Sequence, residues 1–165
     1  MNTAPKVTPA ASRVGFQSAR SRRAKIPSRI SVSALWLARR AGWVAKLVPV
    51  GTKLIQLRIK DRPDAEVRRQ VREAKAVCAL HGAHLIVNDF WQVAIDEGCN
   101  FVHLGQEDLA TADLAAIRSA GLKLGLSTHD EAELETALAA EPHYVALGPV
   151  YPTILKKMPC APQGL

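Results

Sequence analysis

The chain of 165 residues, with 48% hydrophobic and 22% charged residues, is long enough to bury the core of one domain and short for two. Its net charge of +7 is concentrated at one end: residues 1–60 contain 13 Lys and Arg residues and no acid, whereas residues 61–165 contain 9 basic residues and all 15 acids. The charge therefore does not indicate a basic folded surface, and without a run of about 18 apolar residues no transmembrane helix is predicted.

Residues 1–30 are rich in Ser, Ala, Arg and Pro and show little apolar periodicity. Such a segment buries too little apolar surface to offset its ordering entropy, so we predict a basic, disordered segment ahead of a domain over residues 31–165. Three interpretations stay open: an organelle transit peptide, a basic arm for nucleic acid or anionic membrane, or an upstream translation artefact without function. We favour the artefact, because no repeat accompanies the charge.

A helical pattern is predicted from Trp36, because Trp36, Trp43, Val44 and Leu47 fall near one face of a helix. Proline and glycine at positions 49 and 51 should end it. Ahead of this helix, the only candidate for a first strand is "RISVSAL", residues 29–35.

After residue 51, apolar β-branched runs alternate with helical segments. The predicted strands are 53–59, 84–88, 101–105, 123–128 and 144–150, and the predicted helices are 64–82, 90–98, 111–120 and 130–141. Short connections between them require a parallel sheet, in an open doubly wound fold or a barrel. A GxGxxG loop is absent and polar residues follow nearly every strand, which favours a TIM-type (β/α)8 barrel. Five to six units are present, so we expect an incomplete barrel without its last two units.

Three polar side chains alternate with apolar ones in and after the first clear strand. Gln56, Arg58 and Lys60 should share one face, and Ile55, Leu57 and Ile59 the other. The apolar face must pack under helices, so the polar trio should point into the barrel. Buried cations need a carboxylate or an anion, which predicts either an internal salt-bridge cluster or an anion site.

Two carboxylates follow consecutive strands, Asp89 after 84–88 and Asp108 after 101–105. Both should lie at one rim of the barrel, where their charges repel each other unless a cation lies between them. Hard oxygen ligands beside an anion site favour Mg²⁺ completed by water and substrate phosphates. The alternative for Asp89 is the N-cap of the following helix.

Polar residues after the fifth and sixth strands complete the predicted rim. Ser127 offers a hydroxyl or a helix cap, Thr153 can reach an oxygen and Lys156 can reach a phosphate. His103 lies within a strand and is predicted to be a packed core histidine. The cysteines Cys78, Cys99 and Cys160 have no CxxC spacing, which predicts reduced thiols and a cytoplasmic location, with organelle targeting left open.

Five segments in series resemble the thiamine phosphate synthase family over residues 43–165. They are "IQLRIKD" (55–61), "LIVND" (85–89), "VHLGQEDL" (102–109), "GLSTHDEAEL" (125–134) and "YVALGPVYPT" (144–153). The resemblance implies a barrel transferase that joins a hydroxymethylpyrimidine diphosphate to a thiazole phosphate, with release of pyrophosphate, in thiamine biosynthesis. The chain has Leu155 where the family usually has a second threonine.

The resemblance also implies residue roles. It implies that Asp89 and Asp108 hold Mg²⁺, that Thr153 helps to bind the thiazole phosphate, and that the pyrimidine diphosphate is bound by Gln56, Arg58, Lys60, Asn88, Ser127 and Lys156. Of these, Arg58, Lys60 and Lys156 would stabilise the leaving pyrophosphate. Three alternatives stay open: an inactive truncated fragment of the family, a thiazole tautomerase-like relative and, more remotely, a nucleic-acid-binding protein led by its basic arm. Small-molecule substrates are the expected partners, and a homo-oligomer stays open.

Overall fold

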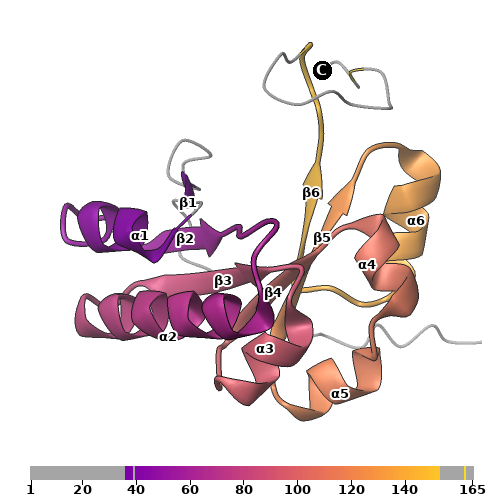
Figure 1. Ribbon diagram of the computed structural model, residues 1–165. Helices are drawn as coiled ribbons and strands as arrows, with labels where there is room; N and C mark the ends of the chain where they lie inside the picture. Colours follow the sequence, from indigo (N-terminus) through magenta and orange to yellow (C-terminus); the bar gives the residue numbers. More distant parts are fainter. Residues whose placement is uncertain (1–35, 39, 153–161, 163–165) are drawn as a thin grey trace, which may run out of the picture.

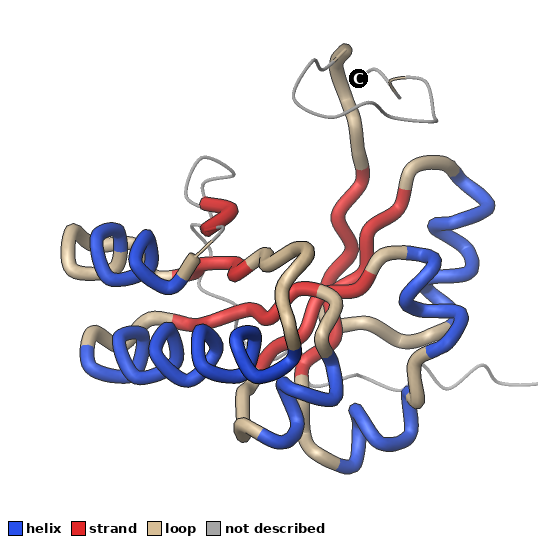
Figure 2. The backbone as a smooth tube through the Cα atoms, in the orientation of Figure 1, coloured by secondary structure: helices blue, strands red, loops and turns tan. Residues whose placement is uncertain are grey.

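The computed structural model describes residues 36–38, 40–152 and 162. Six parallel strands form one sheet in chain order, and the helices lie along the outer side of its curve (Figures 1 and 2). The strands are β1 (Trp36–Ala38), β2 (Leu54–Leu57), β3 (His84–Asn88), β4 (Phe101–Leu104), β5 (Lys123–Thr128) and β6 (Tyr144–Leu147). The helices are α1 (Ala41–Leu47), α2 (Asp64–Leu80), α3 (Trp91–Asp96), α4 (Gln106–Thr111), α5 (Leu114–Ser119) and α6 (Glu131–Ala139).

This topology confirms the predicted incomplete barrel. Each strand pairs in parallel with the strand that precedes it and the strand that follows it in the chain. This order arises when every crossover connection has the same hand and passes over the same face of the sheet. The sheet curls as part of a barrel in place of switching direction as a doubly wound sheet does. Among the residues described, none of the helices has the length and apolarity that crossing a membrane requires.

The helix predicted from Trp36 is wrong at its start. Trp36–Ala38 is strand β1, paired with β2 in the register Trp36↔Ile55, and the helix begins only at Ala41. Pairing with the edge of β2 supplies backbone hydrogen bonds that a local helical pattern does not anticipate. The alternative first strand, 29–35, and the segment 1–30 lie outside the described residues.

The predicted helix 111–120 is two helices. Helix α4 ends at Thr111, and Asp113 then starts α5, because its carboxylate accepts a hydrogen bond from the backbone N–H of Ala116 at 2.9 Å. An Asp that caps a new helix interrupts the helical phase of the apolar residues around it. Helix α4 itself, which begins at Gln106 directly after β4, was not predicted.

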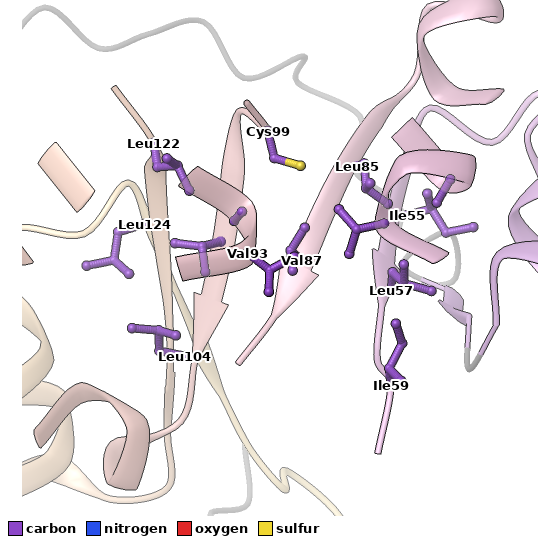
Figure 3. Packing of buried hydrophobic residues seen from close by; sticks show 14 of the residues in the cluster. Ile55, Leu57, Ile59, Leu85, Val87, Val93, Cys99, Leu104, Leu122 and Leu124 are labelled. Atoms are coloured by element: carbon purple, nitrogen blue, oxygen red, sulfur yellow. The ribbon is translucent and has the colours of Figure 1, made fainter. Parts of the chain in front are cut away.

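The core lies between the sheet and the helices, as Figure 3 shows for β2. Ile55, Leu57 and Ile59 are at most 2% exposed and belong to the same cluster as the inner face of α2. That face repeats at helical spacing, with buried residues Val67, Val71, Ala74 and Cys78. The predicted division of β2 into an apolar outer face and a polar inner face is therefore confirmed for its apolar half.

Candidate active site

Two adjacent connections bring together the charged groups that follow β2 and β3. Lys60 donates a hydrogen bond from Nζ to Oδ2 of Asp89 at 2.6 Å, although the two residues are 29 positions apart. The lysine side chain is 51% exposed, whereas the aspartate side chain is 16% exposed. One of the two alternatives left open for the inward cations, an internal salt bridge, is thus present for Lys60, because parallel strands end on the same side.

Asp89 is held in an unusual backbone conformation. Its φ of 67° lies in the left-handed region, which costs free energy for a residue other than glycine. The backbone N–H of Asp89 donates to the carbonyl of His103 at 2.9 Å, and its own carbonyl accepts from Trp91 at 2.9 Å. Neighbouring elements therefore hold this carboxylate at the rim. The residue does not cap α3, whose N-cap is Phe90, so the alternative role as helix cap is wrong.

Asp108 lies in the first turn of α4, beside Asp89. Its Oδ2 accepts a hydrogen bond from the backbone N–H of Gly105 at 3.3 Å. Burial raises the pKa of Asp108, and the charge of Asp89 raises it further, as does a hydrogen bond between the two carboxyl groups. The positive charge of Lys60 opposes this shift only in part. Lys60 thus compensates the negative charge of the two acids only in part, and Asp108 forms no ion pair within the described residues.

These carboxylates fit a small hard cation. Two carboxylates that follow neighbouring strands, in a site where negative charge on Asp108 is unfavourable, match the preference of Mg²⁺ for one or two carboxylates plus water and phosphate oxygens. No group of three or more His, Cys, Asp or Glu side chains that could hold a metal occurs in the described part of the chain. A divalent cation here would therefore take most of its ligands from water or a bound anion.

The polar face of β2 continues the site inward. The side-chain amide of Gln56 donates to Oδ1 of Asn88 at 2.5 Å, and both side chains are 5% exposed. Arg58, next on this face, is partly buried. Within the described ranges, no hydrogen bond or ion pair engages its guanidinium. The predicted internal salt-bridge cluster is therefore present for Lys60 and not for Arg58, which leaves a cation available to an anion.

Ser127 on β5 contacts His103 and Gln106, neither of which was predicted as a site residue. Its hydroxyl lies 2.8 Å from Nε2 of His103, whose Nδ1 is 2.9 Å from the hydroxyl of Tyr144. The carbonyl of Ser127 accepts from the side-chain amide of Gln106 at 2.7 Å, which fastens α4 to β5. His103 is buried, as predicted, but it lies among the polar side chains of the inner face.

The remaining predicted positions, Thr153 and Lys156, lie outside the described residues. His103 and Tyr144 could have been found from the pattern of alternation, since His103 pairs in register with Asn88. Two residues at matching positions on neighbouring parallel strands point to the same face.

We expect Arg58→Met to separate binding from stability. Loss of the guanidinium should lower the affinity for Mg²⁺-pyrophosphate by about tenfold or more, because a charge-assisted hydrogen bond is lost. The free energy of unfolding should stay within about 0.5 kcal/mol or rise, since Arg58 pairs with no carboxylate of the described residues that its loss would leave unpaired. Calorimetric titration and urea unfolding measure the two quantities. Arg118→Met, which removes a charge from α5, is the control and should bind normally.

Comparison with known proteins gives a consistent picture. A family model described as thiamine monophosphate synthase matches residues 30–165. The chain is 70% identical over 125 residues to a thiamine-phosphate synthase of Rhizobium etli, covering 76% of this chain and 61% of that protein. It is 54% identical over 123 residues to a thiamine-phosphate synthase of an Enterobacter species, covering 74% and 58% respectively.

A solved structure resembles the fold described above. The thiamine phosphate pyrophosphorylase of Pyrococcus furiosus superposes with a TM-score of 0.61 at 27% identity, over 68% of this chain and 55% of the other. The chain thus spans about three fifths of the length of the curated relatives that it matches.

Proposed function

The chain belongs to the thiamine monophosphate synthase family, and we propose that its rim binds a pyrimidine diphosphate together with Mg²⁺ for condensation with a thiazole phosphate. The observation that carries the proposal is the meeting of Asp89, Asp108 and Lys60 at one rim of the sheet. Arg58, which forms no ion pair within the described residues, follows Gln56 on the same face of the chain and is suited to bind a metal-bound anion. No comparison favours the alternatives of a tautomerase-like or a nucleic-acid-binding protein.

The reaction breaks the bond between the pyrimidine methylene carbon and the diphosphate oxygen, whose electrons leave with pyrophosphate. The lone pair of the thiazole nitrogen forms the new C–N bond, so no general base is required. As the C–O bond lengthens, negative charge grows on the leaving oxygen. Groups that bind this charge more strongly in the transition state than before it accelerate the step.

The residues of the rim would bind different parts of the substrate and the metal, according to the chemistry of their side chains. Arg58 and Lys60 would bind the diphosphate oxygens, and Ser127 would add a hydroxyl donor. Gln56 and Asn88, already hydrogen-bonded to each other, would orient the pyrimidine end of the substrate.

Asp89 and Asp108 would hold Mg²⁺, which when bound neutralises charge on the diphosphate. Thr153 and Lys156 keep their proposed roles toward the thiazole phosphate and the diphosphate.

The test is direct. The folded chain is incubated with the pyrimidine diphosphate, the thiazole phosphate and Mg²⁺, and thiamine phosphate is measured by chromatography. We expect product in the presence of Mg²⁺ and none after EDTA is added. A folded chain that binds pyrophosphate but forms no product would contradict the proposed condensation, and leave only the proposed anion binding.

A further inference from the structure

A single register row crosses four strands of the inner face. Asn88 pairs with His103, His103 with Gly125, and Gly125 with Tyr144. The position on β5 is a glycine, so no side chain separates the histidine from the tyrosine. A Cβ atom at Gly125 would collide with the Tyr144 ring. The ring therefore lies across β5 and reaches a residue two strands away.

This reach links three polar side chains in series. The Tyr144 hydroxyl is 2.9 Å from Nδ1 of His103, and Nε2 of the same ring is 2.8 Å from the Ser127 hydroxyl. The two rings stack with centroids 5.6 Å apart and an interplanar angle of 22°. Both ring nitrogens of the histidine are thus engaged by hydroxyl groups.

Two hydroxyl partners suit a neutral histidine, because each ring nitrogen faces a group that can either donate or accept a hydrogen bond. Burial raises the pKa of Tyr144, so the phenol keeps its proton. A neutral imidazole has one N–H donor and one acceptor nitrogen, so only two arrangements of protons fit the three groups.

The hydroxyl of Tyr144 decides between them. If Nδ1 carried the proton, it would donate to the tyrosine oxygen, and the phenolic proton would need another acceptor. Within the described residues, His103 is the only group that hydrogen-bonds to this hydroxyl. A phenol donates a hydrogen bond better than it accepts one, and an unprotonated imidazole nitrogen is a good acceptor. On the partly buried Tyr144, a phenol proton without an acceptor also costs more than a spare lone pair. Tyr144 therefore donates to Nδ1, and Nε2–H of His103 donates to Ser127.

This arrangement of protons determines the direction in which the hydroxyl of Ser127, a partly exposed residue, can donate. Since its oxygen already accepts from His103, its own proton is free to donate outward. We propose that Tyr144 and His103 are positioning residues that direct the Ser127 hydroxyl proton toward a phosphate oxygen at the rim. This inference rests on the proposed function, because it takes the anion to be the diphosphate. In the opposite arrangement the serine proton would point at the histidine, and its lone pairs would face and repel an anion.

The proton arrangement is measured first, without ligand. In the full chain labelled with ¹⁵N-histidine, we expect the NMR signals of His103 to show a protonated Nε2 and an unprotonated Nδ1. Tyr144→Phe keeps the ring but removes the donor, so the Nδ1-protonated form should become detectable. Tyr151→Phe is the matched control on the chain's other tyrosine and should leave the signals unchanged. A protonated Nδ1 in the unmodified chain would overturn the proposal.

Binding is measured next, with pyrophosphate and Mg²⁺ as the probe. Ser127→Ala should weaken binding about tenfold or more, as expected for loss of a hydrogen bond to a charged group. Tyr144→Phe should weaken it less, and should have no further effect in the Ser127→Ala background. Additive losses would overturn the proposal, since a tyrosine that only supports the fold would act without the serine.

These outcomes separate the inference from the proposed function. The NMR result and the coupled binding losses can hold while no thiamine phosphate forms, in which case only the condensation fails. Product formation with uncoupled variants would leave the proposed function standing and remove the positioning role. A chain with Nε2 protonated that binds no pyrophosphate would overturn the role of Ser127 toward an anion.

Discussion

Replacing either rim carboxylate by its amide is expected to lower the Mg²⁺-dependent affinity for pyrophosphate by about 100-fold. Asp89→Asn and Asp108→Asn each remove one of the two oxygen anions proposed to hold the metal, and keep the size of the side chain. Asn also tolerates the left-handed backbone that Asp89 adopts. Calorimetric titration of pyrophosphate with and without Mg²⁺ measures the change.

Stability should move in the opposite direction for Asp108→Asn. The folded-state pKa of Asp108 is raised, so ionisation costs the native state free energy that the unfolded chain does not lose. This cost is absent at pH values below the pKa of Asp108 in the unfolded chain, and it is complete at pH values above the pKa of Asp108 in the folded chain. The variant should therefore be more stable than the unmodified chain at neutral pH, and the difference should vanish on acidification. Urea unfolding of both proteins, at neutral pH and at a pH below the unfolded-state pKa, tests the sign of the stability difference.

Asp113→Asn is the matched control for both measurements. It removes a carboxylate at the N-cap of α5, away from the rim, and Asn caps a helix about as well as Asp. Binding should be unchanged in this variant. If Asp113→Asn weakened Mg²⁺-pyrophosphate as much as the rim variants did, net charge and not a metal site would explain the loss.

The second large effect concerns stability alone. Leu57→Ala should lower the free energy of unfolding by about 2–5 kcal/mol, because Leu57 is fully buried between β2 and the helices (Figure 3). Leu80→Ala makes the same chemical change at the end of α2, where the side chain is 81% exposed, and should cost within about 0.5 kcal/mol. Equal losses in the two variants would mean that the face of β2 carrying Leu57 does not pack as described.

The arrangement of strands and helices could be predicted because its signals are local. Alternation in "LIQLRIK" assigned Ile55 and Leu57 to the helix side and Gln56 to the inner side, and the buried faces agree. The sequence also placed Asp89 and Asp108 at one rim, because every strand of a parallel sheet ends on the same side. Their predicted ligand roles stay predictions.

Side-chain periodicity failed at two places, one decided by a distant strand and the other by a local helix cap. Trp36–Ala38 carries a helical pattern, yet the open edge of β2 takes it into the sheet. The single helix predicted over 111–120 is divided because the Asp113 carboxylate begins a new one. In both places a hydrogen-bond partner outweighs the periodicity of the side chains.

By itself the sequence determined the parallel strand–helix order, the apolar and polar faces of β2, and the rim at which the acids gather. Only the tertiary structure decided that Lys60 pairs with Asp89, that Arg58 pairs with no carboxylate in the described part of the chain, and that Tyr144 reaches His103 across a glycine strand position. The physical reason is the sequence separation of the residues whose interactions decide each feature. Periodicity assigns each side chain to a face of its own strand, whereas a contact between residues 41 positions apart depends on the register of three strands and on the empty space at Gly125.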